Sequence, residues 1–240
     1  MTISQVEPEA RASIGSVATV IAFDVNETLL DLRALDEAFE EQLGSAALRA
    51  QWFAQMLQLA FLGGLIGQYV DFTTAQRAAL AMVAERAGRP VSAAQIDEVV
   101  NRMRSLPPHP EVPAALERLR STPLHVVALT NSVQEVADAQ VRNADIDSSF
   151  DRVISADSVR RLKPAPEPYH AVARAYGVEP AEVRLVAAHS WDVSGALAAG
   201  CQAAFVARPG MVLSPLGAQP DIVEPDIARV VDRIISVDLA

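Results

Sequence analysis

A carboxylate, an amide and a hydroxyl follow directly on the first apolar run of the chain. The run Val20–Phe23 ends in Asp24, and Asn26 and Thr28 come two and four residues later. Such a run is typical of a central strand in a parallel sheet, and ligands of these sheets bind beyond the carboxyl ends of the strands. An ionised carboxylate held there by a hydroxyl could act as a nucleophile in covalent catalysis. It could equally cap the following helix.

Polar residues of useful types also follow later apolar segments. Thr130 and Asn131 come directly after residues 124–129. Lys163 precedes a helical stretch, and Asp192 follows a third apolar segment. Because the carboxyl ends of parallel strands meet at one edge of a sheet, we expect these side chains to converge there. Taken singly, each has a structural alternative as a turn former, a solvated surface charge or a helix N-cap.

Strands and helices alternate along the second half of the chain. The pattern predicts strands at residues 124–129, 152–155, 184–187 and 203–207. It predicts helices at residues 112–120, 135–143, 168–176 and 193–199. Together with a first strand that begins near Ser16, this alternation predicts an α/β fold with a Rossmann-like, doubly wound parallel sheet as its core.

A helical block interrupts the alternation after the first strand. Apolar residues recur there at helical spacing, among them Leu43 and Trp52, without the alternation of a strand. Two consecutive prolines beginning at Pro107 end the block, because proline cannot continue a helix. We therefore predict a loose leader at residues 1–16, a core formed by residues 17–35 and 108–240, and an inserted helical cap at residues 36–107.

The composition is that of an ordinary globular protein with an excess of acidic residues. Hydrophobic residues make up 50% of the 240 residues, and the formal net charge is -10. This charge argues against nucleic acid or an anionic membrane as a partner, since both favour clustered Lys and Arg. The sequence has no apolar run near the ~20 residues of a membrane helix and no secretory signal, so we expect a cytoplasmic protein. The lone Cys201 excludes an intrachain disulfide and a Cys-rich metal site.

These motifs resemble those of the haloacid dehalogenase superfamily, and within it the type II L-2-haloacid dehalogenases. The resemblance rests on Phe23-Asp24-Val-Asn26-Glu-Thr28, on Leu129-Thr130-Asn131, on Lys163-Pro-Ala-Pro-Glu-Pro-Tyr169 and on His189-Ser-Trp191-Asp192. It implies that Asp24 attacks a substrate carbon to give an aspartyl ester, which water then hydrolyses. The implied substrate is a small carboxylate, and neither a cofactor nor a metal is needed.

The resemblance also assigns roles to individual side chains. Thr28 would orient the Asp24 carboxylate, and the charge of Lys163 would keep that carboxylate ionised. Asp192 would position or activate the hydrolytic water. Thr130 and Asn131 would hold the substrate carboxylate, while Phe72 and Trp191 would form apolar walls. The full set of expected substrate contacts is Asn26, Phe53, Phe72, Thr130, Asn131, Tyr169 and Trp191.

Two positions depart from the family pattern. Phe53 stands where these dehalogenases have the cap-helix arginine that cradles the departing halide, and His189 stands at the family asparagine. The leaving atom could therefore be a halide or the ring nitrogen of a cyclic imino acid such as L-azetidine-2-carboxylate. A cationic ring would tolerate the aromatic wall of Phe53 through cation–π attraction. We interpret His189 either as a buried structural imidazole or as a proton donor or acceptor near the leaving group.

Other functions of the same fold have to be weighed. Phosphatases of the superfamily place an aspartic acid two residues after the nucleophile, and Asn26 cannot protonate a leaving oxygen. A Mg²⁺-dependent phosphatase is therefore the alternative activity. A catalytically inactive binding protein is the non-enzymatic alternative. The residues that argue against it by their joint presence are Asp24, Thr28, Lys163 and Asp192. The apolar residues 57–65, with Gly63, Gly64 and the following Gly67, favour a homodimer, although such residues also pack a helix pair within a monomer.

Overall fold

The computed structural model describes residues 17–240, so the predicted leader lies outside the described residues. In that part of the chain six parallel strands form one sheet, in the order β3-β2-β1-β4-β5-β6. The strands are β1 (Val20–Phe23), β2 (His125–Thr130), β3 (Arg152–Ser155), β4 (Val183–Ala187), β5 (Gln202–Val206) and β6 (Ile222–Glu224). The strand order reverses between β1 and β4, and this switch point is where open parallel sheets bind ligands. The predicted Rossmann-like sheet is confirmed.

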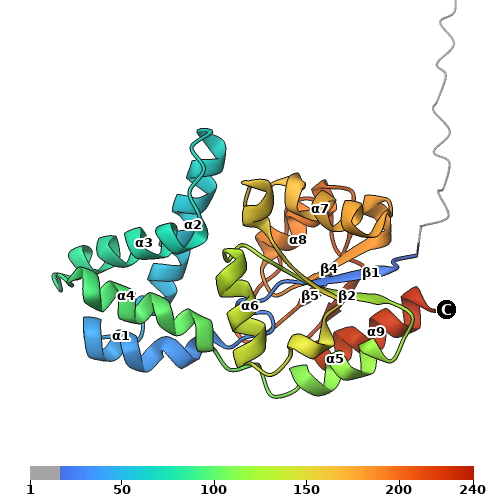
Figure 1. Cartoon of the computed structure of the whole chain (residues 1–240), viewed down its shortest axis with the longest axis horizontal. Coiled ribbons are helices and arrows are strands. Elements are labelled where there is room, and N and C mark those ends of the chain that lie inside the picture. The colour runs from blue at the N-terminus through green and yellow to red at the C-terminus, as the bar shows by residue number, and fades with distance from the viewer. Residues whose placement is uncertain (1–16) are drawn as a thin grey trace, which may run out of the picture.

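Helices cover both faces of the sheet (Figure 1). Along β1, Ile21 and Phe23 pack into one apolar layer, and Val20 and Ala22 into the other, as the alternation of strand side chains requires. Burial on both faces explains why the strand reads as a continuous apolar run. The first layer contains α5 (Val112–Arg120), α6 (Gln134–Asn143) and α9 (Ile227–Asp238), and the second contains α7 (Pro166–Tyr176) and α8 (Ser190–Ala198).

Four further helices follow β1 in the sequence and lie beside the sheet (Figure 1). They are α1 (Asp36–Leu43), α2 (Leu48–Leu65), α3 (Phe72–Arg86) and α4 (Ala93–Arg102). Their apolar residues form one continuous core with the layer that contains α5 and α9. The division into a cap at residues 36–107 and a core stays a proposal, which this placement supports.

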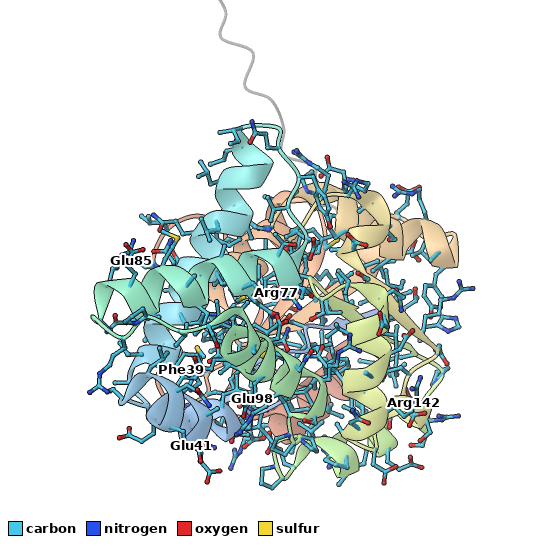
Figure 2. The ribbon with its side chains drawn as sticks, turned by 60° about the vertical axis from the view of Figure 1, so that its left-hand side comes forward. Phe39, Glu41, Arg77, Glu85, Glu98 and Arg142 are labelled. Atoms are coloured by element: carbon cyan, nitrogen blue, oxygen red, sulfur yellow. The ribbon has the colours of Figure 1, made fainter. Side chains whose placement is uncertain are left out.

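The helices of this block turn their apolar residues toward one another. Phe39 of α1 packs against Trp52 of α2, with ring centroids 5.3 Å apart. Figure 2 shows the acidic side chains of Glu41, Glu85 and Glu98 on the outer side of the block, where they are exposed. The block therefore has its own amphipathic helices packed as a bundle.

Some element boundaries differ from those predicted. β1 begins at Val20 rather than near Ser16, and α8 begins at Ser190 rather than at residue 193. α7 begins at Pro166 rather than at residue 168, because the first turn of a helix tolerates proline. β6 and α9 lie beyond the last predicted element. The short 3-10 helices are η1 (Leu32–Leu35), η2 (Met103–Ser105), η3 (Asp147–Ser149), η4 (Ala156–Val159) and η5 (Pro180–Glu182).

None of the helices within residues 17–240 is long and apolar enough to cross a membrane.

Candidate active site

Asp24 lies immediately beyond the carboxyl end of β1 and is almost fully buried. Its backbone N–H donates to the carbonyl oxygen of Val186, which extends the pairing of β1 with β4 by one residue. The chain then turns back, with the N–H of Leu29 donating to the carbonyl of Val25. This turn brings the Thr28 hydroxyl within 2.7 Å of Asp24 Oδ2, to which it donates. Local backbone geometry thus fixes the orientation of the carboxylate.

Lys163 is fully buried and its ammonium donates three hydrogen bonds. They run to Asp24 Oδ1 at 2.9 Å, to Asp192 Oδ2 at 2.6 Å and to the carbonyl of Leu129 at 2.9 Å. Burial alone would lower the pKa of Lys163, but the charges of Asp192 and Asp24 outweigh it and raise that pKa. Lys163 is therefore a permanent cation between two carboxylates.

The pKa of Asp24 shows the consequence of this arrangement. Burial would raise the pKa of Asp24, but the charge of Lys163 and the hydrogen bonds from His189 and Thr28 hold it below its usual range. The carboxylate is thus ionised at neutral pH, as a nucleophile has to be.

The side chain of Asn131 positions Lys163 by bonding to the backbone of the lysine. Its side-chain oxygen accepts a hydrogen bond from the Lys163 N–H at 2.8 Å, and its amide donates to the Lys163 carbonyl at 3.1 Å. Thr130 is buried beside it, and its hydroxyl oxygen accepts from the N–H of Ser132. Both residues lie at the predicted strand end, but the Asn131 side chain is engaged in holding Lys163. Their contact with a substrate carboxylate stays a prediction.

Asp192 has hydrogen-bond donors on both of its oxygens. Oδ2 accepts from Lys163, and Oδ1 accepts from the hydroxyl of Tyr169 at 2.5 Å. Burial raises the pKa of Asp192 against the opposing charge of Lys163. Gly195, one helical turn further along α8, leaves room for this contact, because a Cβ atom there would lie 2.6 Å from the Tyr169 hydroxyl. Tyr169 and Asp192 thus form a hydrogen-bonded pair that fixes the position of the Lys163 ammonium.

His189 contacts the Asp24 carboxylate directly. Its Nδ1 lies 3.2 Å from Asp24 Oδ2, and its Nε2 lies 2.9 Å from Glu27 Oε2. A carboxylate beside each ring nitrogen requires a proton on each, so the side chain is an imidazolium. Burial would lower the pKa of His189, but the hydrogen bonds to Asp24 and Glu27 raise it to about 9. His189 is therefore part of the site.

Two aromatic rings enclose this imidazolium. Phe53 stacks on it with centroids 5.4 Å apart and an interplanar angle of 17°. Trp191 stacks with centroids 5.2 Å apart and an angle of 25°. The histidine thus occupies a face of Phe53 that the sequence suggested for a cationic substrate ring.

Glu27 and Arg49 were not predicted as site residues. Glu27 adopts a positive φ of 62°, a conformation that favours glycine, and its carboxylate also lies 3.6 Å from the guanidinium of Arg49. Arg49 in turn donates to Asp36 at 2.5 Å. Two sequence signals could have pointed to these residues. One is a charged residue in the turn that follows Asp24, and the other is an arginine one helical turn before Phe53.

Asn26 and Phe72 are the other two residues with a predicted substrate contact that have to be placed. The Asn26 amide donates to Ser132 Oγ at 3.3 Å, and its oxygen accepts from Gln140 Nε2 at 2.8 Å. Asn26 is thus held by α6. Phe72 is buried at the first turn of α3. A substrate contact of either residue stays a prediction.

Metal binding depends on the same carboxylates. No cluster of three or more His, Cys, Asp or Glu side chains within residues 17–240 has a geometry that could hold a metal ion. The ammonium of Lys163 lies between Asp24 and Asp192 and pairs with both carboxylates. The charge of these carboxylates is balanced by the protein itself.

Comparisons with known proteins identify the family and the fold. A family model of haloacid dehalogenase-like hydrolases matches residues 18–200. Haloacetate dehalogenase H-2 of Moraxella sp. (strain B) is 31% identical over 216 residues, which are 89% of this chain and 96% of that protein. (S)-2-haloacid dehalogenase of Xanthobacter autotrophicus is 33% identical over 190 residues, which are 78% of this chain and 74% of that protein.

A solved structure shows the same relationship. The L-2-haloacid dehalogenase from Xanthobacter autotrophicus superposes with a TM-score of 0.86 at 27% identity, covering 93% of this chain and 100% of that one. The fold, the strand-end motifs and these matches agree along most of the chain. The chain therefore belongs to the haloacid dehalogenase-like hydrolase family of enzymes.

Proposed function

We propose that the chain hydrolyses a bond at the α-carbon of small 2-substituted carboxylic acids through an ester on Asp24. The observation that carries this proposal is the pair of contacts on the carboxylate: Lys163 on Oδ1 and Thr28 on Oδ2. They keep Asp24 ionised and aimed, and the lysine charge also offsets the negative charge of a substrate carboxylate.

The reaction has two steps. In the first, an oxygen of Asp24 forms a bond to the α-carbon while the bond to the leaving atom breaks and that atom keeps the electron pair. In the second, water attacks the carboxyl carbon of Asp24, the ester opens, and a 2-hydroxy acid departs. Attack from the side opposite the leaving atom inverts the α-carbon.

Two leaving groups are supported by separate observations. The similar haloacetate and (S)-2-haloacid dehalogenases favour a halide, for which the His189 imidazolium supplies positive charge in place of the missing arginine. The ring nitrogen of L-azetidine-2-carboxylate is favoured by the same imidazolium in another way, because an amine accepts a proton on leaving and a halide does not. The 2-haloacid is the first candidate and the cyclic imino acid the second.

The site argues against the two alternatives. A phosphatase needs an acid two residues after the nucleophile, and here Asn26 is fixed by Gln140 and Ser132. A binding protein would not need three charged side chains buried together, since their desolvation is costly. The buried group formed by Asp24, Lys163 and Asp192 therefore favours an enzyme over a binding protein.

The test is a substrate screen with three readouts. Halide, amine and phosphate release are measured with chloroacetate, L-2-chloropropionate, L-azetidine-2-carboxylate and a phosphate ester. A single turnover in H₂¹⁸O should place the label in the carboxylate of Asp24, because water attacks that carbon. Phosphate release without any label in Asp24 would refute the proposal.

We further propose a homodimer and a cytoplasmic location. Leu65, with 86% of its surface exposed, and Ile66 at the end of α2 leave apolar surface for pairing. Gly63 has a different role from the one expected, since a Cβ atom there would lie 2.6 Å from the carbonyl of Gln68. Light scattering of the wild type and of Leu65→Glu tests the pairing, and a monomeric wild type would refute it.

A further inference from the structure

The two carboxylates beside His189 differ in their access to solvent. Asp24 lies at the buried end of β1, whereas the Glu27 side chain is 14% exposed. Glu27 lines a pocket of about 150 Å³ that also includes Arg33, whose side chain is 67% exposed. The contacts from Asp24 through His189 to Glu27 therefore connect the nucleophile with the protein surface.

The backbone of Glu27 shows that its side chain is kept at an unfavourable position. A φ of 62° disfavours every residue that carries a Cβ atom, and glycine would fit the turn more easily. The turn holds this conformation through a hydrogen bond from the Glu27 N–H to the carbonyl of Leu30. Glutamate at this position provides what glycine could not, because its carboxylate contacts His189 and Arg49.

Asp192 is poorly placed to activate water. Both of its oxygens accept hydrogen bonds, one from Lys163 and one from Tyr169, and its side chain is fully buried. His189 Nδ1, in contrast, lies 3.2 Å from an oxygen of the carboxylate that water has to attack.

We propose that His189 and Glu27 form a proton relay in which His189 is first the acid toward the leaving atom and then the base toward the hydrolytic water. The proposal rests on the proposed attack of Asp24 at the α-carbon. Glu27 is a positioning residue that holds the imidazole through Nε2 and favours its protonated form.

Formation of the ester sets the order of these roles. Before attack, two carboxylates favour the imidazolium. The ester removes the negative charge of Asp24, so that Glu27 alone faces the ring and His189 gives up a proton more readily. The same step that consumes the nucleophile therefore prepares the base.

The protons balance for both leaving groups. With a neutral ring amine, the nitrogen takes the bonding electron pair and the proton from His189 Nδ1. Water then returns one proton to His189, and its other proton leaves on the hydroxyl of the 2-hydroxy acid. With a halide, the anion leaves without a proton. His189 must then first release its Nδ1 proton to water, so that the neutral ring, still bonded to Glu27 through its Nε2–H, can take a proton from the hydrolytic water at Nδ1; one proton per turnover is released.

The charged groups near the relay define its pH dependence. Asp24 and Glu27 face His189. Arg49 from α2 faces Glu27. Phe53 from α2 and Trp191 from α8 stack on the imidazole ring. Beyond Glu27 the pocket adds four charged or titratable side chains, which are Asp31, Arg33, His109 and Arg208.

The test compares His189→Asn and Glu27→Gln with the wild type and with the exposed, matched variant Glu40→Gln. The Asp24 peptide is analysed by mass after rapid mixing with L-2-chloropropionate or L-azetidine-2-carboxylate. We expect His189→Asn to lose about 10²–10⁴-fold in turnover of both acids and to accumulate the ester with L-2-chloropropionate, whose halide leaves without a proton. Glu27→Gln should slow the cyclic imino acid more than the chloro acid, because only a leaving nitrogen takes a proton from the imidazolium that Glu27 favours. Glu40→Gln should match the wild type.

A pH profile separates the relay from a structural role. Glu27→Gln removes one of the carboxylates that favour the imidazolium, so the limb of the ester-hydrolysis profile that reports His189 should move to lower pH. Glu27→Gly, which suits the positive φ, provides a second variant in case Glu27→Gln does not fold, and it should show the same shift.

Two results would contradict the proposal in distinguishable ways. Wild-type turnover and no ester in both His189→Asn and Glu27→Gln would overturn the relay and leave the proposed function intact. A wild type that releases neither halide nor amine, and takes no ¹⁸O into Asp24, would overturn the proposed function and the relay with it.

Discussion

Replacing Lys163 with methionine removes the one charge that separates Asp24 from Asp192. With Nζ 2.9 Å from Asp24 Oδ1 and an effective dielectric constant of about 20, the attraction is roughly 6 kcal/mol. Desolvation offsets part of this, and breaking a buried pair lowers the free energy of unfolding by about 3–5 kcal/mol. For a chain of this size the melting temperature should fall by about 6–20 °C, at about 2–4 °C per kcal/mol.

The pH dependence of this loss has a defined sign. In the wild type Lys163 helps to hold the pKa of Asp24 below its usual range, which stabilises the fold above the unfolded pKa and is lost as the pH falls. In the variant two buried carboxylates repel each other, so their pKa values rise and the variant loses stability as the pH rises. The difference in the free energy of unfolding between the wild type and Lys163→Met should therefore be largest near pH 8 and shrink toward pH 5.

The assay is thermal unfolding at several pH values, combined with turnover of the preferred acid. We expect turnover to fall by about 10²–10³-fold, the usual effect of losing one charge-stabilising donor. Arg229→Met, which removes an exposed cation, should change the free energy of unfolding by less than about 0.5 kcal/mol. A small loss of stability that is independent of pH would refute the assignment of Lys163 as the counterion.

Four further outcomes are expected. Asp24→Asn should abolish turnover and keep the fold, since an amide cannot form the ester; activity assays and circular dichroism check this. Turnover should survive EDTA, because Lys163 supplies the positive charge; complete loss restored by Mg²⁺ would favour phosphoryl transfer. Phe53→Arg should raise kcat/KM for L-2-chloropropionate relative to L-azetidine-2-carboxylate, because a guanidinium stabilises a leaving anion and repels a cationic ring. Gly195→Ala should lower the free energy of unfolding by about 1–3 kcal/mol, measured in urea, because its methyl group would overlap Tyr169 and Pro164.

The sheet and the position of Asp24 at the end of β1 were predictable because their signals are local. A strand buried on both faces needs a continuous apolar run, and the polar residues after β1 and β2 stand at the end of each run. Neighbouring parallel strands end at the same edge, so convergence follows from the topology. The convergence of Lys163 and Asp24, 139 residues apart in the sequence, was predicted in this way, whereas the role of the lysine charge came from the family resemblance.

The role of Glu27 could not be predicted from local signals. Its positive φ depends on the turn between β1 and η1, and glutamate gives no sign of that conformation, as a glycine would have done. Its partner His189 is 162 residues away, on the loop before α8. The engagement of Asn131 with the backbone of Lys163 is likewise a tertiary feature.

The departures from the family pattern are in contact with one another, which argues that they form one altered subsite. Phe53 stacks on His189, His189 is bonded to Glu27, and Glu27 is paired with Arg49, one helical turn before Phe53 on α2. The positive charge that the resemblance places at position 53 is thus found on the imidazolium. Arginine remains charged at every physiological pH, whereas histidine can give up its proton and take it back. An arginine can only stabilise an anion that leaves, but an imidazolium can also protonate the leaving atom. This chain has phenylalanine at position 53 and histidine at position 189, where the family pattern has arginine and asparagine. We therefore expect these two differences to extend the range of leaving groups from halides to amines.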